Sequence, residues 1–289
     1  MKVLVTGAYG RVGTALIDHL ADREAYEFTY LNRSDRPADH PYGGHDTVVA
    51  DVANYDAIRP AFDGQDAVVH LAAYPTTDGR WEDVFEPNLV GMNNVLKAAR
   101  EAEVGTFVFG STHHVVGMYE TDNAPEIYDP DFGLVIDHTD PVRPDSHYAA
   151  TKVFGEAYGR YYTENFDYPT RFYALRIGSV RMPDDDHPYG DAESGFSVSA
   201  TLGTDEADAN PDRDSERYRR KVLRMKSTWQ SRRDCAHQFD CCLRDDDVTF
   251  DVFYGVSDND RRWLDIDHAR EVVGYDPQDN AEEWDAPPE

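Results

Sequence analysis

The sequence predicts an α/β fold in which a single parallel sheet carries helices on both faces. Short apolar segments alternate with amphipathic helical patterns through roughly the first 180 residues, and this alternation is typical of a doubly wound parallel sheet. A glycine-containing turn at residues 7–13 joins the first apolar segment directly to the first helical pattern. A chain of 289 residues is long enough for one such domain with a small additional region.

Strands are predicted from short apolar runs rich in β-branched and aromatic residues, and helices from apolar residues at i, i+3 and i+4. We expect a nucleotide-binding domain over residues 1–180 and a smaller substrate-binding region over residues 181–289. The predicted strands are 2–6, 27–31, 47–50, 67–71, 106–110, 171–177 and 248–255, and the predicted helices are 13–21, 84–102, 148–166, 225–243 and 264–273.

The charge balance restricts the partners of the protein. Fifty-six acidic residues against 28 basic ones give a net formal charge of −28, and only five of the basic residues are lysines. Such a charge argues against nucleic acid as a partner. Because the acidic residues are spread along the whole chain, we expect a protein adapted to a salt-loaded cytoplasm, where molar salt screens charges to within about 3 Å.

The first residues, the apolar segments and the cysteines give no indication of secretion or of a membrane span. The first residues lack the basic and long apolar regions of a secretory signal, and no segment approaches the roughly 20 apolar residues of a membrane span. Cys235, Cys241 and Cys242 fit neither a disulfide framework nor a zinc site and are expected to be packing residues. We therefore expect a cytoplasmic protein without a membrane partner or a metal.

Three glycines, Gly7, Gly10 and Gly13, follow the first predicted strand. In a strand-turn-helix unit the first permits a tight turn, the second lets the backbone approach a pyrophosphate, and the third packs the helix against the strand. Arg11 and Val12 lie within the same turn, and the helix that follows would direct its positive N-terminus at the phosphates. The sequence therefore predicts a Rossmann-type dinucleotide site.

Two later strands end in residues suited to the same site. Asp51 and Val52 follow one of them; a carboxylate there could contact the adenine ring, although Asp is also a favoured helix N-cap. Leu71, Ala72 and Ala73 follow the next strand, where small residues leave room for a cofactor. Both segments extend the predicted dinucleotide site.

The end of the second predicted strand decides between NAD and NADP. An acidic side chain there holds the ribose hydroxyls, whereas arginine holds a 2′-phosphate. This chain has Asn32 and Arg33, followed two residues later by Asp35. Arg33 leaves NADP open, and Asp35 could serve NAD if the loop is one or two residues longer than usual.

Tyr148 and Lys152 are four residues apart on one face of a predicted helix. A nearby cation favours the phenolate and is expected to draw the pKa of the tyrosine below its usual ~10, giving a base usable near neutral pH. Ser111 follows the strand predicted at 106–110. The same spacing also occurs on ordinary helix faces, but combined with Ser111 and the glycine turn it predicts a catalytic group.

These features, together with Asn88, make the sequence similar to the extended short-chain dehydrogenase/reductase superfamily. The second half resembles the uronate dehydrogenases, a group that includes the halophilic archaeal NAD-dependent glucose-6-phosphate dehydrogenases. The resemblance extends over nearly the whole chain except about 183–219. Its most specific segments are residues 111–119, 176–179, 224–229, 254–257 and 279–282.

The resemblance implies oxidation of a sugar at C1 to a lactone, with NAD as the coenzyme. Tyr148 would take the proton of the anomeric hydroxyl, Ser111 would hydrogen-bond the same oxygen, and Lys152 would bind the nicotinamide ribose. Arg224 would bind a carboxylate or a phosphate at C6. The other residues implied are Asn88 and Ile177 at the coenzyme and Pro75, Thr112, His113, His114 and Ser179 at the sugar.

Glucose 6-phosphate is expected to be preferred over a hexuronate. Lys226 and Arg232 or Arg233 add positive charge near Arg224 in an otherwise acidic chain, and a phosphate gains more from extra cations than a carboxylate does. Against this expectation, residues i and i+2 of a helix, such as Arg224 and Lys226, face different ways.

Two features depart from the family. His113 stands where the family usually has asparagine, and 45 positions separate Ser179 from Arg224. The intervening acidic segment, about 183–219, is expected either to cover the site or to project from the surface, with the second slightly favoured.

Two other classes of function compete. A nucleotide-sugar epimerase or dehydratase shares the cofactor apparatus but usually has a larger C-terminal region than the roughly 110 residues after Ser179. A non-catalytic dinucleotide-binding protein typically lacks Tyr148 or Lys152, and both are present. We therefore expect a dehydrogenase with a small-molecule sugar substrate, acting as a homo-oligomer.

Overall fold

The computed structural model describes residues 1–193 and 212–288 of the chain. Its centre is one seven-stranded sheet in the order β3-β2-β1-β4-β5-β6-β7, and all neighbouring strands are parallel. The doubly wound α/β fold predicted from the sequence is confirmed. The strands are β1 (Lys2–Thr6), β2 (Glu27–Asn32), β3 (Thr47–Val49), β4 (Ala67–His70), β5 (Thr106–Thr112), β6 (Arg171–Ile177) and β7 (Phe250–Gly255).

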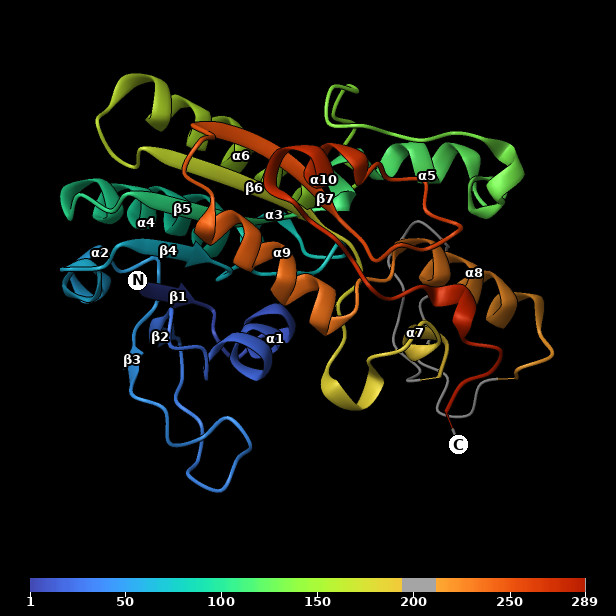
Figure 1. Cartoon of the computed structure of the whole chain (residues 1–289), viewed down its shortest axis with the longest axis horizontal. Coiled ribbons are helices and arrows are strands. Elements are labelled where there is room, and N and C mark those ends of the chain that lie inside the picture. Colours follow the sequence, from blue (N-terminus) through green and yellow to red (C-terminus); the bar gives the residue numbers. More distant parts are fainter. Residues whose placement is uncertain (194–211, 289) are drawn as a thin grey trace.

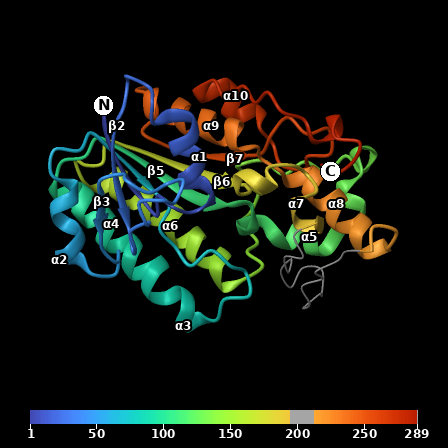
Figure 2. The same ribbon diagram turned by 90° about the horizontal axis from the view of Figure 1, so that it is seen from below.

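Helices cover both faces of the sheet (Figures 1 and 2). Side chains of β1 alternate between the two faces, so that Val3 and Val5 join one apolar core and Leu4 joins the other. The first face carries α1 (Arg11–Leu20), α9 (Arg232–Arg244) and α10 (Asp267–Val273), and the second carries α2 (Tyr55–Ile58), α3 (Trp81–Val84), α4 (Gly91–Glu101) and α6 (His147–Asn165).

A third group of helices lies beyond the carboxyl ends of β5, β6 and β7, at the right of Figure 1. It consists of α5 (Gly117–Asn123), α7 (Gly190–Glu193) and α8 (Glu216–Thr228). The acidic segment that the sequence places between the two halves begins and ends in this group, but residues 194–211 lie outside the described part. Whether this segment covers the site or projects from the surface therefore stays a prediction.

Three predicted elements differ from the structure. β5 continues through Ser111 to Thr112, so the predicted catalytic serine is a strand residue. The helix predicted at 84–102 consists of α3, a π-helical stretch (Phe85–Val90) and α4. The single helix predicted at 225–243 is wrong, because α8 ends at Thr228 and α9 begins at Arg232. Between them Trp229 forms a parallel bridge with Ser179.

The structure also bears on the cysteines and on the question of a membrane. All three cysteines are free and buried, which confirms their packing role. Over residues 1–193 and 212–288 we find no helix that is both long and apolar enough to cross a membrane. The same ranges contain no group of three or more side chains that could hold a metal ion.

Candidate active site and coenzyme cavity

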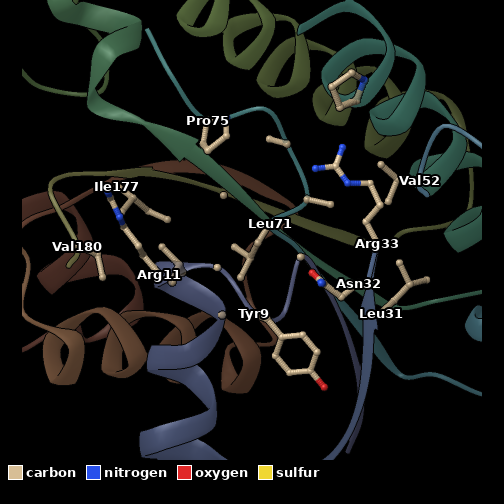
Figure 3. Close-up of a pocket in the computed structure, with 18 of the residues that line it drawn as sticks. Tyr9, Arg11, Leu31, Asn32, Arg33, Val52, Leu71, Pro75, Ile177 and Val180 are labelled. Carbon is tan, nitrogen blue, oxygen red and sulfur yellow. The ribbon is translucent and has the colours of Figure 1, made fainter. Parts of the chain in front are cut away.

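One cavity of about 430 Å³ opens at the carboxyl ends of the parallel strands, the edge at which open α/β sheets bind ligands. The glycine turn forms its floor, and Figure 3 shows Leu31, Arg33 and Val52 at one end and Arg11 and Ile177 at the other. The predicted site residues that line it are Gly7, Gly10, Arg11, Val12, Gly13, Asn32, Arg33, Asp51, Val52, Leu71, Ala72, Ala73, Pro75, Ser111, Thr112, Tyr148, Lys152 and Ile177.

The glycine turn fits the pyrophosphate of a dinucleotide. Gly7 has a φ of 72°, and a Cβ atom there would lie 2.6 Å from the backbone nitrogen of Ala72. At Gly10 the nearest atom to a Cβ would be Gly7 O at 3.4 Å, so the backbone faces open space at the N-terminus of α1. Oriented N–H groups and the positive helix end attract phosphate at such a position.

Asp51 lines the cavity directly after β3. Its Oδ1 atom accepts a hydrogen bond from Ala53 N at 2.9 Å. The competing interpretation of Asp51 as a helix N-cap is wrong, because Asn54 caps α2 by accepting from Ala57 N.

Lys152 and Tyr148 are both buried in the wall of the cavity, one helical turn apart on α6. Lys152 Nζ donates to Gly110 O at 2.6 Å and lies 4.6 Å from the centre of the Phe109 ring. Burial lowers the pKa of Lys152 to about 7, although the charge of Glu156 opposes this change. Near neutral pH the ammonium group therefore exchanges its proton readily.

Burial raises the pKa of Tyr148 to about 12, while a hydrogen bond from Thr112 acts in the opposite direction. The expectation that Lys152 draws this pKa below its usual value is wrong for this structure. Lys152 Nζ is engaged by Gly110 O and lies 5.8 Å from the centre of the Tyr148 ring. Desolvation of the phenolate and the charge of Asp145 therefore raise the pKa, and Lys152 does not offset them.

Ser111 contacts a buried network that sequence reasoning missed. Its hydroxyl donates to Glu156 Oε1 at 2.6 Å, and Arg176 donates to both oxygens of that carboxylate at 3.0 and 2.9 Å. Arg176 also donates to Tyr254 Oη at 2.9 Å. The position of Glu156, one turn after Lys152 on α6, was the available signal in the sequence.

The two predicted sugar-binding histidines lie just beyond the cavity wall. His113 is buried, its Nδ1 atom lies 3.2 Å from Ile177 O, and burial lowers its pKa well below the usual value. His114 Nδ1 lies 2.6 Å from Asp145 Oδ2. Burial alone would raise the pKa of Asp145, but the hydrogen bond with His114 and the charge of His114 keep it below its usual value.

Arg224 is buried and paired with a carboxylate that sequence reasoning also missed. Its Nε atom lies 2.8 Å from Glu120 Oε1, and Nη2 donates to Glu120 Oε2 at 3.1 Å. Tyr128 donates to the same carboxylate at 2.8 Å. Burial alone would lower the pKa of Arg224, but the charge of Glu120 raises it. Nη2 also lies 3.4 Å from His113 Nε2, which connects Arg224 to the catalytic end of β5.

Six predicted ligand contacts are absent from the cavity lining: His113, His114 and Arg224, described above, and Asn88, Asp35 and Ser179. Asn88 instead accepts from Tyr74 N at 2.7 Å and donates to Thr151 Oγ1 at 2.9 Å, so it fixes a loop behind the cavity. Asp35 is exposed, and its Oδ1 accepts from Arg36 N at 2.7 Å. Ser179 Oγ pairs with Thr228 Oγ1 at 3.1 Å.

The extra cations predicted near Arg224 belong to other contacts. Lys226 Nζ donates to Trp284 O at 2.9 Å, Arg232 pairs with Asp18 of α1, and Arg233 pairs with Asp279. The helix break after Thr228 is the reason, because it turns Arg232 and Arg233 away from α8. The interpretation of these three residues as partners of Arg224 is wrong.

A dinucleotide-type glycine turn and a buried tyrosine-lysine pair in one cavity define an oxidoreductase class of site. The family model described as the NAD dependent epimerase/dehydratase family matches residues 3–192. The chain belongs to this family, and NAD is its coenzyme. The expected similarity to extended short-chain dehydrogenases is thereby confirmed.

Three relatives narrow the comparison. The chain is 36% identical over 286 residues to the NAD-dependent glucose-6-phosphate dehydrogenase of Haloferax volcanii, across 98% of this chain and 95% of that protein. It is 33% identical over 287 residues to the L-arabinose 1-dehydrogenase (NAD(P)(+)) of the same organism, across 97% of each. A uronate dehydrogenase variant of Agrobacterium tumefaciens complexed with NAD has a TM-score of 0.71 at 26% identity, over 100% of this chain and 91% of that one.

Proposed function

We propose that the protein oxidises the C1 hydroxyl of a pyranose with an anionic group at C6 to the lactone, with glucose 6-phosphate as the preferred substrate. One observation carries the proposal. The buried tyrosine-lysine pair shares a cavity with the glycine turn. Close to this cavity, Arg224 Nη2 lies 3.4 Å from Nε2 of His113, and His113 directly follows the strand β5 that ends in Ser111 and Thr112. The full-length similarity to a glucose-6-phosphate dehydrogenase supports it.

Tyr148, Thr112 and Lys152 each have a separate role in the proposed reaction. Tyr148 accepts the proton of the C1 hydroxyl, and Thr112, already hydrogen-bonded to Tyr148, positions the phenol. Lys152 binds the coenzyme ribose and passes protons, since its pKa of about 7 lets it exchange them near neutral pH. Bound NAD supplies the hydride acceptor for C1 and a positive nicotinamide ring that favours the phenolate of Tyr148.

The basic residues of α8 favour a phosphate at C6. Arg217, Arg220, Lys221 and Arg224 follow one another at i, i+3, i+4 and i+7, which places them on one face of the helix. Burial and the charge of Glu120 raise the pKa of Tyr128, and the charge of Arg220 acts in the opposite direction, so Arg220 lies close enough to Tyr128 to affect it. A phosphate near two negative charges gains more from such a face than a carboxylate does.

A hexuronate is the second candidate, and Glu120 is the observation that favours it. Glu120 already offsets the charge of Arg224, which suits a singly charged carboxylate better than a phosphate dianion. Carboxylate and phosphate at C6 would occupy the same corner of the site, so the fold does not separate them.

Reduction of NAD by purified protein tests both candidates. The substrates are glucose 6-phosphate, glucuronate, galacturonate, arabinose and glucose, and we expect the highest kcat/KM with glucose 6-phosphate. A higher value with either uronate selects the second candidate. Conversion of a nucleotide sugar without net NAD reduction would contradict both and select an epimerase.

The assembly and location of the protein complete the proposal. We infer a homo-oligomer in the cytoplasm. Phe154 and Tyr161 of α6 are exposed and stack with the half-buried Tyr158, and an aromatic surface of this kind is suited to burial against a second copy. Light scattering of the purified protein measures the mass, and a monomer would contradict the inference.

A further inference from the structure

The loop after β2 forms the wall of the cavity at which coenzymes with and without a 2′-phosphate differ. Asn32, Arg33, Ser34 and Arg36 line the cavity here. Asn32 occupies the last position of β2, and its Nδ2 atom donates to Ser34 O at 2.8 Å. The carboxamide therefore shapes the loop, and an amide cannot replace a carboxylate as a strong acceptor for two ribose hydroxyls.

The acidic residue of this loop takes no part in the cavity lining. Asp35 is exposed, accepts a hydrogen bond from Arg36 N, and does not line the cavity. Within residues 32–36, all of them described, the cavity wall therefore carries positive charge and no carboxylate. Asp51 lines the cavity beside Val52, but its Oδ1 is engaged by Ala53 N, and it offers one carboxylate against two guanidinium groups.

The two arginines are held at different places on this wall. Arg36 is half-buried, its Nη2 atom donates to Tyr9 O at 3.4 Å, and its guanidinium lies 5.5 Å from the centre of the Tyr9 ring. Tyr9 belongs to the glycine turn and is hydrogen-bonded to Thr47. Arg33 is exposed and extends over the cavity beside Val52 (Figure 3). One guanidinium is thus pre-positioned and the other can move onto a ligand.

From this arrangement we propose that Arg33 and Arg36, with Ser34 between them, form a binding site for the 2′-phosphate of NADP, so that the protein uses NADP as well as NAD. A phosphate monoester carries close to two negative charges and three acceptor oxygens, which match two guanidinium forks and a hydroxyl. NAD still binds, because the glycine turn and the lysine-tyrosine pair do not depend on the 2′ position. The proposal rests on the coenzyme cavity of the proposed dehydrogenase and is independent of the sugar.

Fluorescence titration of the intact protein with NADPH and with NADH tests this site without turnover. For the unaltered protein we expect the Kd for NADPH to lie within about tenfold of that for NADH. The double variant Arg33→Ala/Arg36→Ala should raise the Kd for NADPH by roughly 10- to 100-fold, since each charge-assisted contact accounts for about one factor of ten in affinity. The Kd for NADH should change by less than about threefold. Arg160→Ala on α6, an exposed arginine with a 3.9 Å ion pair, should change neither.

Two results would overturn the proposal. One is an unaltered protein that binds NADPH more than about 100-fold more weakly than NADH. The other is equal loss of both coenzymes in the double variant, which would assign the arginines to the adenine or the pyrophosphate. Failure of both coenzymes to bind the unaltered protein would instead contradict the dehydrogenase function itself.

Discussion

Ser111 donates its hydroxyl hydrogen to Glu156 Oε1 at 2.6 Å, so its oxygen presents lone pairs rather than a donor to the cavity. In the proposed reaction the single proton of the C1 hydroxyl would pass to Tyr148, and Ser111 would hydrogen-bond the C1 oxygen only by turning its own hydroxyl hydrogen away from Glu156. Glu156 keeps this orientation because Arg176 holds both of its oxygens. The catalytic strand is thus connected to a buried ion pair.

Glu156→Gln should therefore lower stability strongly. The variant keeps an oxygen that can accept from Ser111, but it leaves the charge of Arg176 buried without a partner, which costs about 3–5 kcal/mol. Urea denaturation followed by circular dichroism measures the change. Glu164→Gln on the same helix, 62% exposed with a 3.9 Å ion pair, is the control and should change the free energy of unfolding by less than ~0.5 kcal/mol. Similar values for both variants would contradict the structural role of the pair.

Tyr148→Phe should reduce kcat by about 100-fold or more, because the ring remains and only the proton acceptor is lost. The affinity for NADH should stay within about threefold of the unaltered protein. Tyr161→Phe, an exposed tyrosine of α6, should leave kcat unchanged. Steady-state rates with a sugar substrate and NADH titration measure the two effects, and near-normal turnover by the Tyr148 variant would exclude it as the base.

Most of the fold could be predicted because its signals are local. Periodicity and glycine spacing predict β1, β2, β3, β4 and β6 within one residue of the structure, and β5 and β7 within two. The helix predicted at 225–243 failed because residues 229–231 contain neither glycine nor proline. The interruption comes instead from the non-local bridge of Trp229 to Ser179. Only the N-cap at Ser231, which accepts from Asp234 N, marks the new helix locally.

The candidate site shows the same difference between residues with a local sequence signal and residues placed by non-local contacts. The residues around the coenzyme cavity belong to motifs at strand ends and could be predicted. Glu120 is 104 residues from Arg224, and no spacing rule connects two residues so far apart. Asn88 has the residue type expected at a ligand, but its amide is already engaged by Tyr74 and Thr151. Which polar groups contact a ligand depends on such non-local partners.

Lys152→Met should stabilise the protein in a pH-dependent manner. The pKa of Lys152 is about 7 in the folded protein and near 10.4 in an unfolded chain. The unfolded state therefore binds more protons between these values, so the cost of burying the charge is fully present below pH 7 and is lost as the pH rises toward 10.4. The variant should be more stable than the unaltered protein at pH 6, by an amount that shrinks by roughly 1.4 kcal/mol for each pH unit above 7. Chemical denaturation across this range measures it, and a pH-independent difference would contradict the assignment.

Low ionic strength should destabilise the protein, because a net charge of −28 repels itself more strongly as screening weakens. Between about 1 M and about 0.01 M KCl the screening length grows from about 3 Å to about 30 Å. We expect the Tm to fall markedly over this range and a neutral osmolyte at equal osmolarity not to restore it. A Tm that is the same in dilute buffer and in molar KCl would show that repulsion between the acidic residues does not lower the stability of the protein.

Arg224→Ala should cost roughly 10- to 100-fold in kcat/KM for glucose 6-phosphate, since a charge-assisted hydrogen bond contributes about 1.5–3 kcal/mol. The kcat/KM for free glucose, which lacks the anion, should fall little. The single variant also leaves Glu120 as an unpaired charge in the core, so it is destabilised as well as impaired.

The double variant Arg224→Met/Glu120→Leu separates these effects, because replacing both members of a buried ion pair by apolar residues of similar volume is often neutral for stability. In this background kcat/KM for glucose 6-phosphate should remain low while that for glucose approaches the unaltered value. Parallel rate measurements with both sugars, each checked against the Tm of the same preparation, distinguish loss of substrate binding from loss of stability. If the charged and the uncharged sugar lose equally in a folded double variant, Arg224 supports the core through Glu120 and does not bind the substrate anion. The remaining basic residues of α8, Arg220 and Lys221, would then be the groups to vary next.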